Sequence, residues 1–198
     1  MDNIYNKIWK LARPYYEKGR IYDIPHIEWM IQQTERICKI ESLDEKLLIP
    51  IGILHDVGYS EQKDNNPNIK SQDSKKAHMV AGEKIARKIL EKVNYHHNLQ
   101  KIVHYISVHD NWILGDNTPY KECKEMGVFN DLDFLWGQSS YEMLRYQGES
   151  IGKTPAEMYV FWMKDEKLIN RPFSCESTRK MFKEFMDKRK EEISLHKL

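Results

Sequence analysis

Histidines and aspartates are the side chains of this 198-residue chain whose positions suggest chemistry. Two His-Asp doublets occur, His55-Asp56 and His109-Asp110. Doublets of this kind also arise by chance in a chain with eight histidines. The positions of these residues and the side chains around them must therefore decide which of them act.

The first doublet follows residues 47–54, the most apolar segment of the chain. At about 100° per residue, His55 shares a helix face with Leu48 and Ile51. Asp56 lies beside that face. An imidazole and a carboxylate at a buried helix end are costly unless they are paired or bound to a metal. A histidine that complements the helix dipole, with Asp56 capping the turn, explains the doublet equally well.

Three further histidines lie on apolar faces of three other predicted helices: His26, His78 and His109. A single histidine on an apolar face is usually a core residue with a satisfied hydrogen bond. Inward-facing histidines from four helices, however, can converge as metal ligands in a helical bundle. We expect the remaining four at the surface: His96, His97, His104 and His196.

An anionic ligand is expected from a later helix, in residues 129–137. Asp131 and Asp133 point about 160° apart on a helix, so at most one can face the site. Asp131 shares its face with Phe134, and Asp133 shares its face with Phe129. Periodicity alone does not choose between them, and either could be an exposed or capping carboxylate.

The elements that must position these residues are all predicted to be helices. The second predicted helix follows Asp23, its expected cap, and runs through Ile40. The other predicted helices cover 3–18, 43–56, 74–93, 98–110, 128–137, 138–147, 154–169 and 176–193. Ser42 and Glu45 form a capping-box pattern before the third helix, and Gly58 is expected to end it. Residues 59–73 and 111–127 have loop composition. No strand pattern occurs, so the predicted class is all-α.

The ordered set of motifs resembles the HD-domain superfamily of metal-dependent phosphohydrolases, which is named for its His-Asp doublet. HDVGYS resembles the doublet segment, DIPHIEWM the opening segment and DLDFLWG the closing segment. The closing motif places the ligand at Asp133. In some branches two additional histidines bind a second metal, and their positions resemble His78 in HMVAGEKIA and His109 in IVHYISVHD.

This resemblance implies a single domain over residues 1–198. Its fold would be a compact multi-helix bundle, with an HD core at about 20–140 and a C-terminal helical extension at about 141–198. The first metal would take His26, His55, Asp56 and Asp133. The second would take His78 and His109, with Asp56 as a bridge. His55 and Asp56 would form the catalytic doublet.

Nitrogen and oxygen donors suit Mn, Fe, Zn, Co or Ni, as one ion or two, with Mg as a further candidate. The cysteines, Cys38, Cys123 and Cys175, lie too far apart in sequence to form a CxxC zinc pair. The implied activity is hydrolysis of a nucleotide or another small phosphate ester by a metal-activated water. The alternatives are a di-iron oxygenase of the same superfamily and a non-catalytic metal-binding signalling domain.

The expected partner is therefore a small phosphate-bearing molecule. Trp29 and Phe134 stand where many relatives carry a basic residue. Other cations are candidates for contact with phosphate: Lys75, Lys76, Lys84 and Arg145. A net charge of +1 argues against a nucleic-acid polymer as partner. The longest apolar run has eight residues, too few to span a membrane, and the N-terminus resembles no signal peptide, so the cytoplasm is expected.

Overall fold

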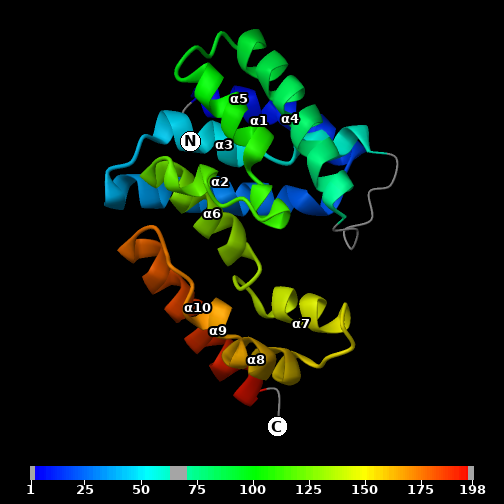
Figure 1. The fold of residues 1–198 in the computed structure, drawn as a ribbon, viewed down its shortest axis with the longest axis vertical. Helices are drawn as coiled ribbons and strands as arrows, with labels where there is room; N and C mark the ends of the chain where they lie inside the picture. The colour runs from blue at the N-terminus through cyan, green and yellow to red at the C-terminus, as the bar shows by residue number, and fades with distance from the viewer. Residues whose placement is uncertain (1–2, 63–70, 196–198) are drawn as a thin grey trace. The chain divides into compact units, whose positions relative to one another are not determined.

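The computed structural model describes residues 3–62 and 71–195 (Figure 1). Within those residues the chain forms ten α-helices and four short 3-10 helices and no strand, which confirms the all-α class. The α-helices are α1 (Asn3–Lys18), α2 (Ile24–Glu41), α3 (Glu45–Leu54), α4 (Gln72–Lys92), α5 (Leu99–Val108), α6 (Lys124–Trp136), α7 (Tyr141–Glu149), α8 (Pro155–Lys164), α9 (Glu166–Ile169) and α10 (Glu176–Leu195). The 3-10 helices are η1 (Ile21–Asp23), η2 (Val57–Glu61), η3 (Asn111–Leu114) and η4 (Pro119–Lys121).

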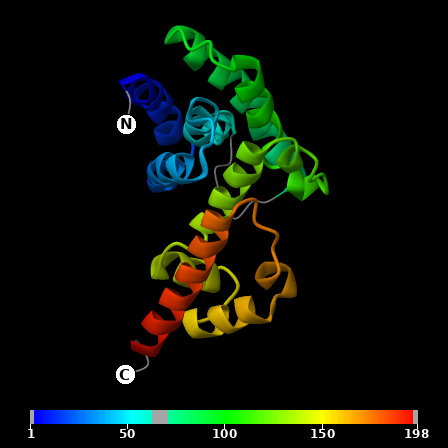
Figure 2. The ribbon, with the colours of Figure 1, turned by 90° about the vertical axis from the view of Figure 1, so that its left-hand side faces the viewer.

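The chain divides into two compact units, Met1–Asn130 and Asp131–Leu198, and the division falls within α6. In the first unit α4 packs against η2 and α5, and α2 packs against α3; Figure 1 shows α4 and α5 side by side. In the second unit α8 packs against α7, α9 and α10 (Figure 2). The single-domain organisation implied by the resemblance stays a prediction.

The core of the first unit surrounds α3. Every residue from Leu47 to Leu54 is buried, in agreement with the apolar run seen in the sequence. The helix continues through Pro50, and its C-terminal end brings His55 and Asp56 into the interior. The most apolar helix therefore positions the doublet, because burying it also buries the residues that follow.

The start of α3 differs from the predicted capping box. Ser42 is the C-terminal cap of α2, in a left-handed conformation with φ 53°. Asp44 is the N-cap of α3, and its Oδ1 accepts hydrogen bonds from the backbone N–H groups of Lys46 (3.0 Å) and Leu47 (3.3 Å). The capping-box prediction was wrong because Asp44, two residues further on, offers the better-placed acceptor.

Gly58 does not end α3 as predicted, since that helix ends at Leu54. It lies within η2, directly against α4. A Cβ atom at this position would lie 1.9 Å from the carbonyl oxygen of His78 and 2.5 Å from the backbone nitrogen of Gly82. The glycine therefore permits the close approach between the doublet segment and the helix that carries His78.

Other observed helix boundaries differ from the predicted ones by a few residues. Much of the predicted loop 59–73, residues 63–70, lies outside the described residues. The predicted loop 111–127 contains η3 and η4, and α6 already begins at Lys124. The predicted helix 154–169 is broken at Asp165, whose extended backbone and side chain cap α9. No helix among the described residues is both long and apolar enough to cross a membrane.

Candidate metal centre

The four histidines that were expected to face inward are buried. The exposed fractions of these residues are small: His26 6%, His55 1%, His78 0% and His109 2%. They come from the first turn of α2, the end of α3, the first half of α4 and the end of α5. Of the four expected at the surface, His96, His97 and His104 are exposed and His196 lies outside the described residues. The sequence therefore separated the buried from the exposed histidines among the described residues.

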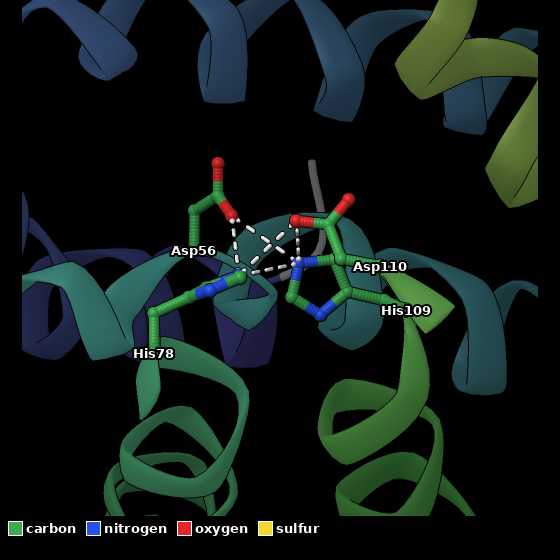
Figure 3. A group of neighbouring side chains, drawn as sticks. All are labelled: Asp56, His78, His109 and Asp110. Atoms are coloured by element: carbon green, nitrogen blue, oxygen red, sulfur yellow. Dashed lines mark hydrogen bonds and ion pairs between the residues drawn. The ribbon is translucent and has the colours of Figure 1, made fainter. Parts of the chain in front are cut away.

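These histidines form two groups with nearby carboxylates. One group contains Asp56, His78, His109 and Asp110, and Figure 3 shows their side chains turned towards one another. The other contains His26, His55 and Asp56. Within each group one ligand atom per residue lies within 4.8 Å of all the others. Asp56 belongs to both groups, as its expected bridging position requires.

The spacing in the first of these groups suits a single ion. His78 Nε2 lies 3.1 Å from His109 Nε2, and Asp56 Oδ1 lies 3.6 Å and 3.3 Å from these two nitrogens. Asp110 Oδ2 lies 3.3 Å and 3.7 Å from the same nitrogens. Ligand atoms that share an ion at bond lengths of about 2.1 Å lie about 3.0–3.4 Å apart.

Hydrogen bonds to the backbone set the orientation of the two facing imidazoles. His109 Nδ1 lies 2.8 Å from the carbonyl oxygen of Ile106, and His78 Nδ1 lies 3.4 Å from that of Ser74. A carbonyl oxygen only accepts, so in each ring Nδ1 is the nitrogen that carries the hydrogen. The neutral rings then direct two Nε2 lone pairs at each other, an arrangement that a cation between them stabilises. The residues present therefore fit a metal ion.

Asp56 is held in its ionised form. Burial favours the neutral acid, but His55, His109 and Arg20 outweigh it and keep the pKa of Asp56 well below its ordinary value. Its Oδ1 faces His78 and His109, while its Oδ2 lies 3.6 Å from His55 Nε2. One carboxylate thus presents a separate oxygen to each group.

The two facing histidines have opposite tendencies to bind a proton. Burial and the neighbouring His109 lower the pKa of His78 to about 3, so its ring is neutral at physiological pH. Burial also disfavours charge on His109, but Asp56 and Asp110 outweigh it and raise the pKa of His109. A proton on His109 is therefore the natural competitor of a metal at this position.

Two cations lie beside the cluster. Lys75, one of the cations expected to contact phosphate, donates from Nζ to Asp110 Oδ2 at 2.5 Å. Arg20 pairs with Asp23 at 3.0 Å, and its guanidinium lies 4.1 Å from the ring centroid of Tyr59. Burial lowers the pKa values of Arg20 and Lys75. Neighbouring anions, Asp56 among them, outweigh burial and raise both pKa values above their ordinary range. Both side chains therefore stay charged.

The other candidate cations lie elsewhere. Lys76 and Lys84 line an open groove of about 730 Å³ that also contains Tyr15 and Val80. Arg145, in the second unit, forms a 2.7 Å ion pair with Glu149.

The two candidate aspartates of α6 differ in their surroundings. Asp131 is 1% exposed, and its Oδ2 accepts hydrogen bonds from the backbone nitrogen of Ser174 (2.7 Å) and from Thr178 Oγ1 (2.9 Å). The carboxylate of Asp131 therefore binds the segment that leads into α10 and the first turn of that helix. Asp133 is half-buried and belongs to neither of the two groups found among the described residues. Its role as a ligand stays a prediction.

Two residues at the centre were not expected from the sequence. Asp110 is buried beside His109, and the second His-Asp doublet was the signal that could have indicated it. Arg20 stands outside the predicted helices, where no periodic pattern points to the interior. Its position is evident only once η2 packs against α1.

Comparison with known families agrees with this geometry. The family model for the HD domain matches residues 24–154, about two thirds of the chain, so the chain belongs to the HD-domain family. This family is generally one of metal-dependent hydrolases. No curated protein and no solved structure matches the chain.

Proposed function

We propose that this protein is a metal-dependent phosphohydrolase that acts on a nucleotide or another small phosphate ester. The observation that carries the proposal is the pair of buried His/Asp groups that share Asp56 in a chain of the HD-domain family. Buried carboxylates and imidazoles at this density are costly unless an ion compensates them.

The residues that would hold metal are those implied by the family motifs. His26, His55, Asp56 and Asp133 would bind one ion, and Asp56, His78 and His109 would bind the other. Mixed nitrogen and oxygen donors suit Mn, Fe, Zn, Co or Ni. When bound there, divalent ions polarise a phosphoryl group and lower the pKa of a coordinated water from 15.7 towards about 7.

Helix geometry supports Asp133 rather than Asp131 in this set. The ring of Phe129 lies 5.2 Å from the ring of His55, centroid to centroid. Asp133 follows Phe129 by four residues on α6, so the two share one helix face. Asp131 instead holds the start of α10.

The chain supplies its own phosphate contacts at Arg20 and Lys75. Each stays charged, each is partly buried, and both lie close to the ring of Tyr59, at 4.1 Å and 5.6 Å from its centroid. Tyr59 in turn stacks on His78, with ring centroids 4.1 Å apart. In this proposal the two side chains bind phosphate oxygens and replace the basic residues that Trp29 and Phe134 displace.

The charge of such a centre suits a phosphate monoester. Two divalent ions carry four positive charges, and Arg20 and Lys75 add two. The carboxylates assigned to the centre and its border are those of Asp23, Asp56, Asp110 and Asp133. Burial and the neighbouring Asp56 raise the pKa of Asp23 to about 7, so that carboxylate is only partly ionised at neutral pH and the excess lies between two and three positive charges. This excess complements a phosphate monoester, which carries a charge of about −1.5 to −2 at neutral pH.

The test is phosphate release by metal-loaded protein under strict anaerobiosis. A panel of nucleotides and sugar phosphates, each assayed with Mn²⁺, Co²⁺, Zn²⁺, Fe²⁺ and Mg²⁺, should identify a substrate that is hydrolysed without oxygen. Lys75→Gln should raise KM at least tenfold, while Lys76→Gln, its exposed neighbour, should change KM little. Turnover that requires oxygen would support the di-iron oxygenase instead. Absence of turnover with every substrate and metal would contradict the proposal.

A further inference from the structure

We propose that Asp110 is a ligand of the second metal ion, and that Lys75 and Trp112 position its carboxylate. The second site would then have four protein donors: Asp56, His78, His109 and Asp110. This inference rests on the metal dependence of the proposed function. It adds a ligand that the family motifs in this sequence do not indicate.

The position of Asp110 relative to the two histidines matches that of Asp56. The Asp110 side chain is 5% exposed, and its Oδ2 lies within 3.7 Å of both facing Nε2 atoms. Asp56 Oδ1 lies within 3.6 Å of the same two atoms. The imidazoles therefore meet a carboxylate oxygen from each of two residues (Figure 3).

Two donors fix the orientation of the Asp110 carboxylate. Trp112 donates from Nε1 to Oδ1 at 2.8 Å, and Lys75 donates from Nζ to Oδ2 at 2.5 Å. A carboxylate offers about four lone-pair positions, so Oδ2 can keep Lys75 and still bind an ion. Partners of this kind orient metal ligands and tune metal affinity.

The backbone around Asp110 is also held in place. The hydroxyl of Tyr120 donates to the carbonyl oxygen of His109 at 2.8 Å and accepts from the backbone nitrogen of Trp112 at 3.0 Å. One buried side chain thus ties the end of α5 to the start of η3. The carboxylate between these two points is set before any ion arrives.

The ligand set defines the kind of ion. Two nitrogens and two oxygens from four side chains suit tetrahedral Zn²⁺ or Co²⁺. Mg²⁺ demands octahedral oxygen ligands and keeps several waters, so it fits poorly. A site with four protein donors leaves no open position when the ion is tetrahedral. The second ion would therefore hold Asp56, and Lys75 would supply the phosphate contact on this side of the centre.

The experiment is calorimetric titration of metal-free protein with Zn²⁺, together with the visible spectrum after Co²⁺ substitution. Asp110→Asn should weaken binding of one ion by about tenfold to a hundredfold, while the other ion binds as in the wild type. The same variant should change the Co²⁺ spectrum. Asp116→Asn changes a half-buried carboxylate in the following loop that belongs to neither group of candidate ligands, so it is the matched control and should change neither. Trp112→Phe should weaken binding of the same ion by about tenfold.

The outcomes separate this inference from the proposed function. Two ions bound with wild-type affinity and an unchanged Co²⁺ spectrum in Asp110→Asn would overturn the role of Asp110 and leave the proposed function standing. If Asp110→Asn fails to fold, Trp112→Phe decides, because it removes only one N–H from a half-exposed side chain; wild-type affinity there would overturn the inference. A wild-type protein that takes up no ion would overturn both.

Discussion

The Nε2 atoms of His78 and His109 face each other at 3.1 Å, although the two residues come from different helices. The packing of α4 against α5 brings them together, and backbone carbonyls hold both Nδ1 atoms away from the centre. Two lone pairs at this separation repel each other unless a proton or a metal ion lies between them. The relationship therefore links the packing of two helices directly to metal binding.

Gly58 allows η2, which follows the His-Asp doublet, to pack directly against α4, the helix that carries His78. Gly58→Ala should lower the free energy of unfolding by at least about 2 kcal/mol, because the new Cβ meets backbone atoms of α4 that cannot rotate away. It should also reduce metal uptake by displacing His78. Urea unfolding and metal analysis measure the two effects.

Gly82→Ala is the matched control for Gly58→Ala. Its Cβ would meet a side-chain atom of Ile106 at 3.3 Å and the carbonyl oxygen of His55 at 3.5 Å, contacts that small shifts relieve. Alanine also favours the helix by roughly 0.5–1 kcal/mol over glycine. Equal losses of stability in both variants would show that the close approach at Gly58 is not the limiting contact.

The two aspartates of α6 should respond differently to the same substitution. Asp133→Asn should abolish activity and weaken metal binding, since it replaces an anionic ligand with a neutral amide of nearly the same volume. Asp131→Asn should leave metal binding intact but lower stability by about 1–3 kcal/mol, because the buried oxygen that accepts from Ser174 and Thr178 loses its negative charge.

Metal titration, phosphatase assay and thermal unfolding of both variants form the test. Loss of metal in Asp131→Asn with normal metal binding in Asp133→Asn would mean that the closing motif has been aligned two residues out of register.

The N-cap of α3 gives a pH-dependent prediction. Partial burial raises the pKa of Asp44, but hydrogen bonds from His97 and from the backbone outweigh it and lower the pKa below its ordinary value. A carboxylate with a lowered folded-state pKa stabilises the protein above the unfolded value of about 3.9, and this contribution is lost as the pH falls through the folded-state pKa. Asp44→Ala should therefore cost about 1 kcal/mol at pH 7 and less at pH 3.

Ser42→Ala is the control that distinguishes the observed cap from the predicted capping box. It should be nearly neutral in urea unfolding at both pH values, since Ser42 ends α2 and does not cap α3. A larger loss for Ser42→Ala than for Asp44→Ala would restore the capping box.

The sequence predicted the fold class and the inward-facing histidines because both follow from helical periodicity. His26, His55, His78 and His109 each lie on an apolar stripe, and a buried stripe buries its histidine. The capping pattern did not predict the start of α3, because Ser42 and Asp44 are both acceptors that can cap a helix and lie two residues apart. Sequence patterns also do not predict contacts between elements that are distant in sequence. Such contacts explain why position 58 requires glycine and why Arg20 lies beside the metal centre.

Asp110 shows the same limit within the site. It follows His109 after the last turn of α5, where the backbone leaves the helix and periodicity no longer predicts direction. The hydrogen bonds from Lys75 and Trp112 decide where it points, and neither donor could be inferred from spacing.

Metal content of the Asp56→Ala variant tests the central claim most directly, because Asp56 is the only residue shared by the two groups found among the described residues. Wild-type protein, Asp56→Ala and His104→Ala would be loaded with Mn²⁺, Zn²⁺ or Fe²⁺, dialysed and analysed for bound metal. We expect up to two ions per chain in the wild type and in His104→Ala, and loss of most of the metal in Asp56→Ala. Wild-type protein without metal uptake, or Asp56→Ala with a full complement of ions, would contradict the account.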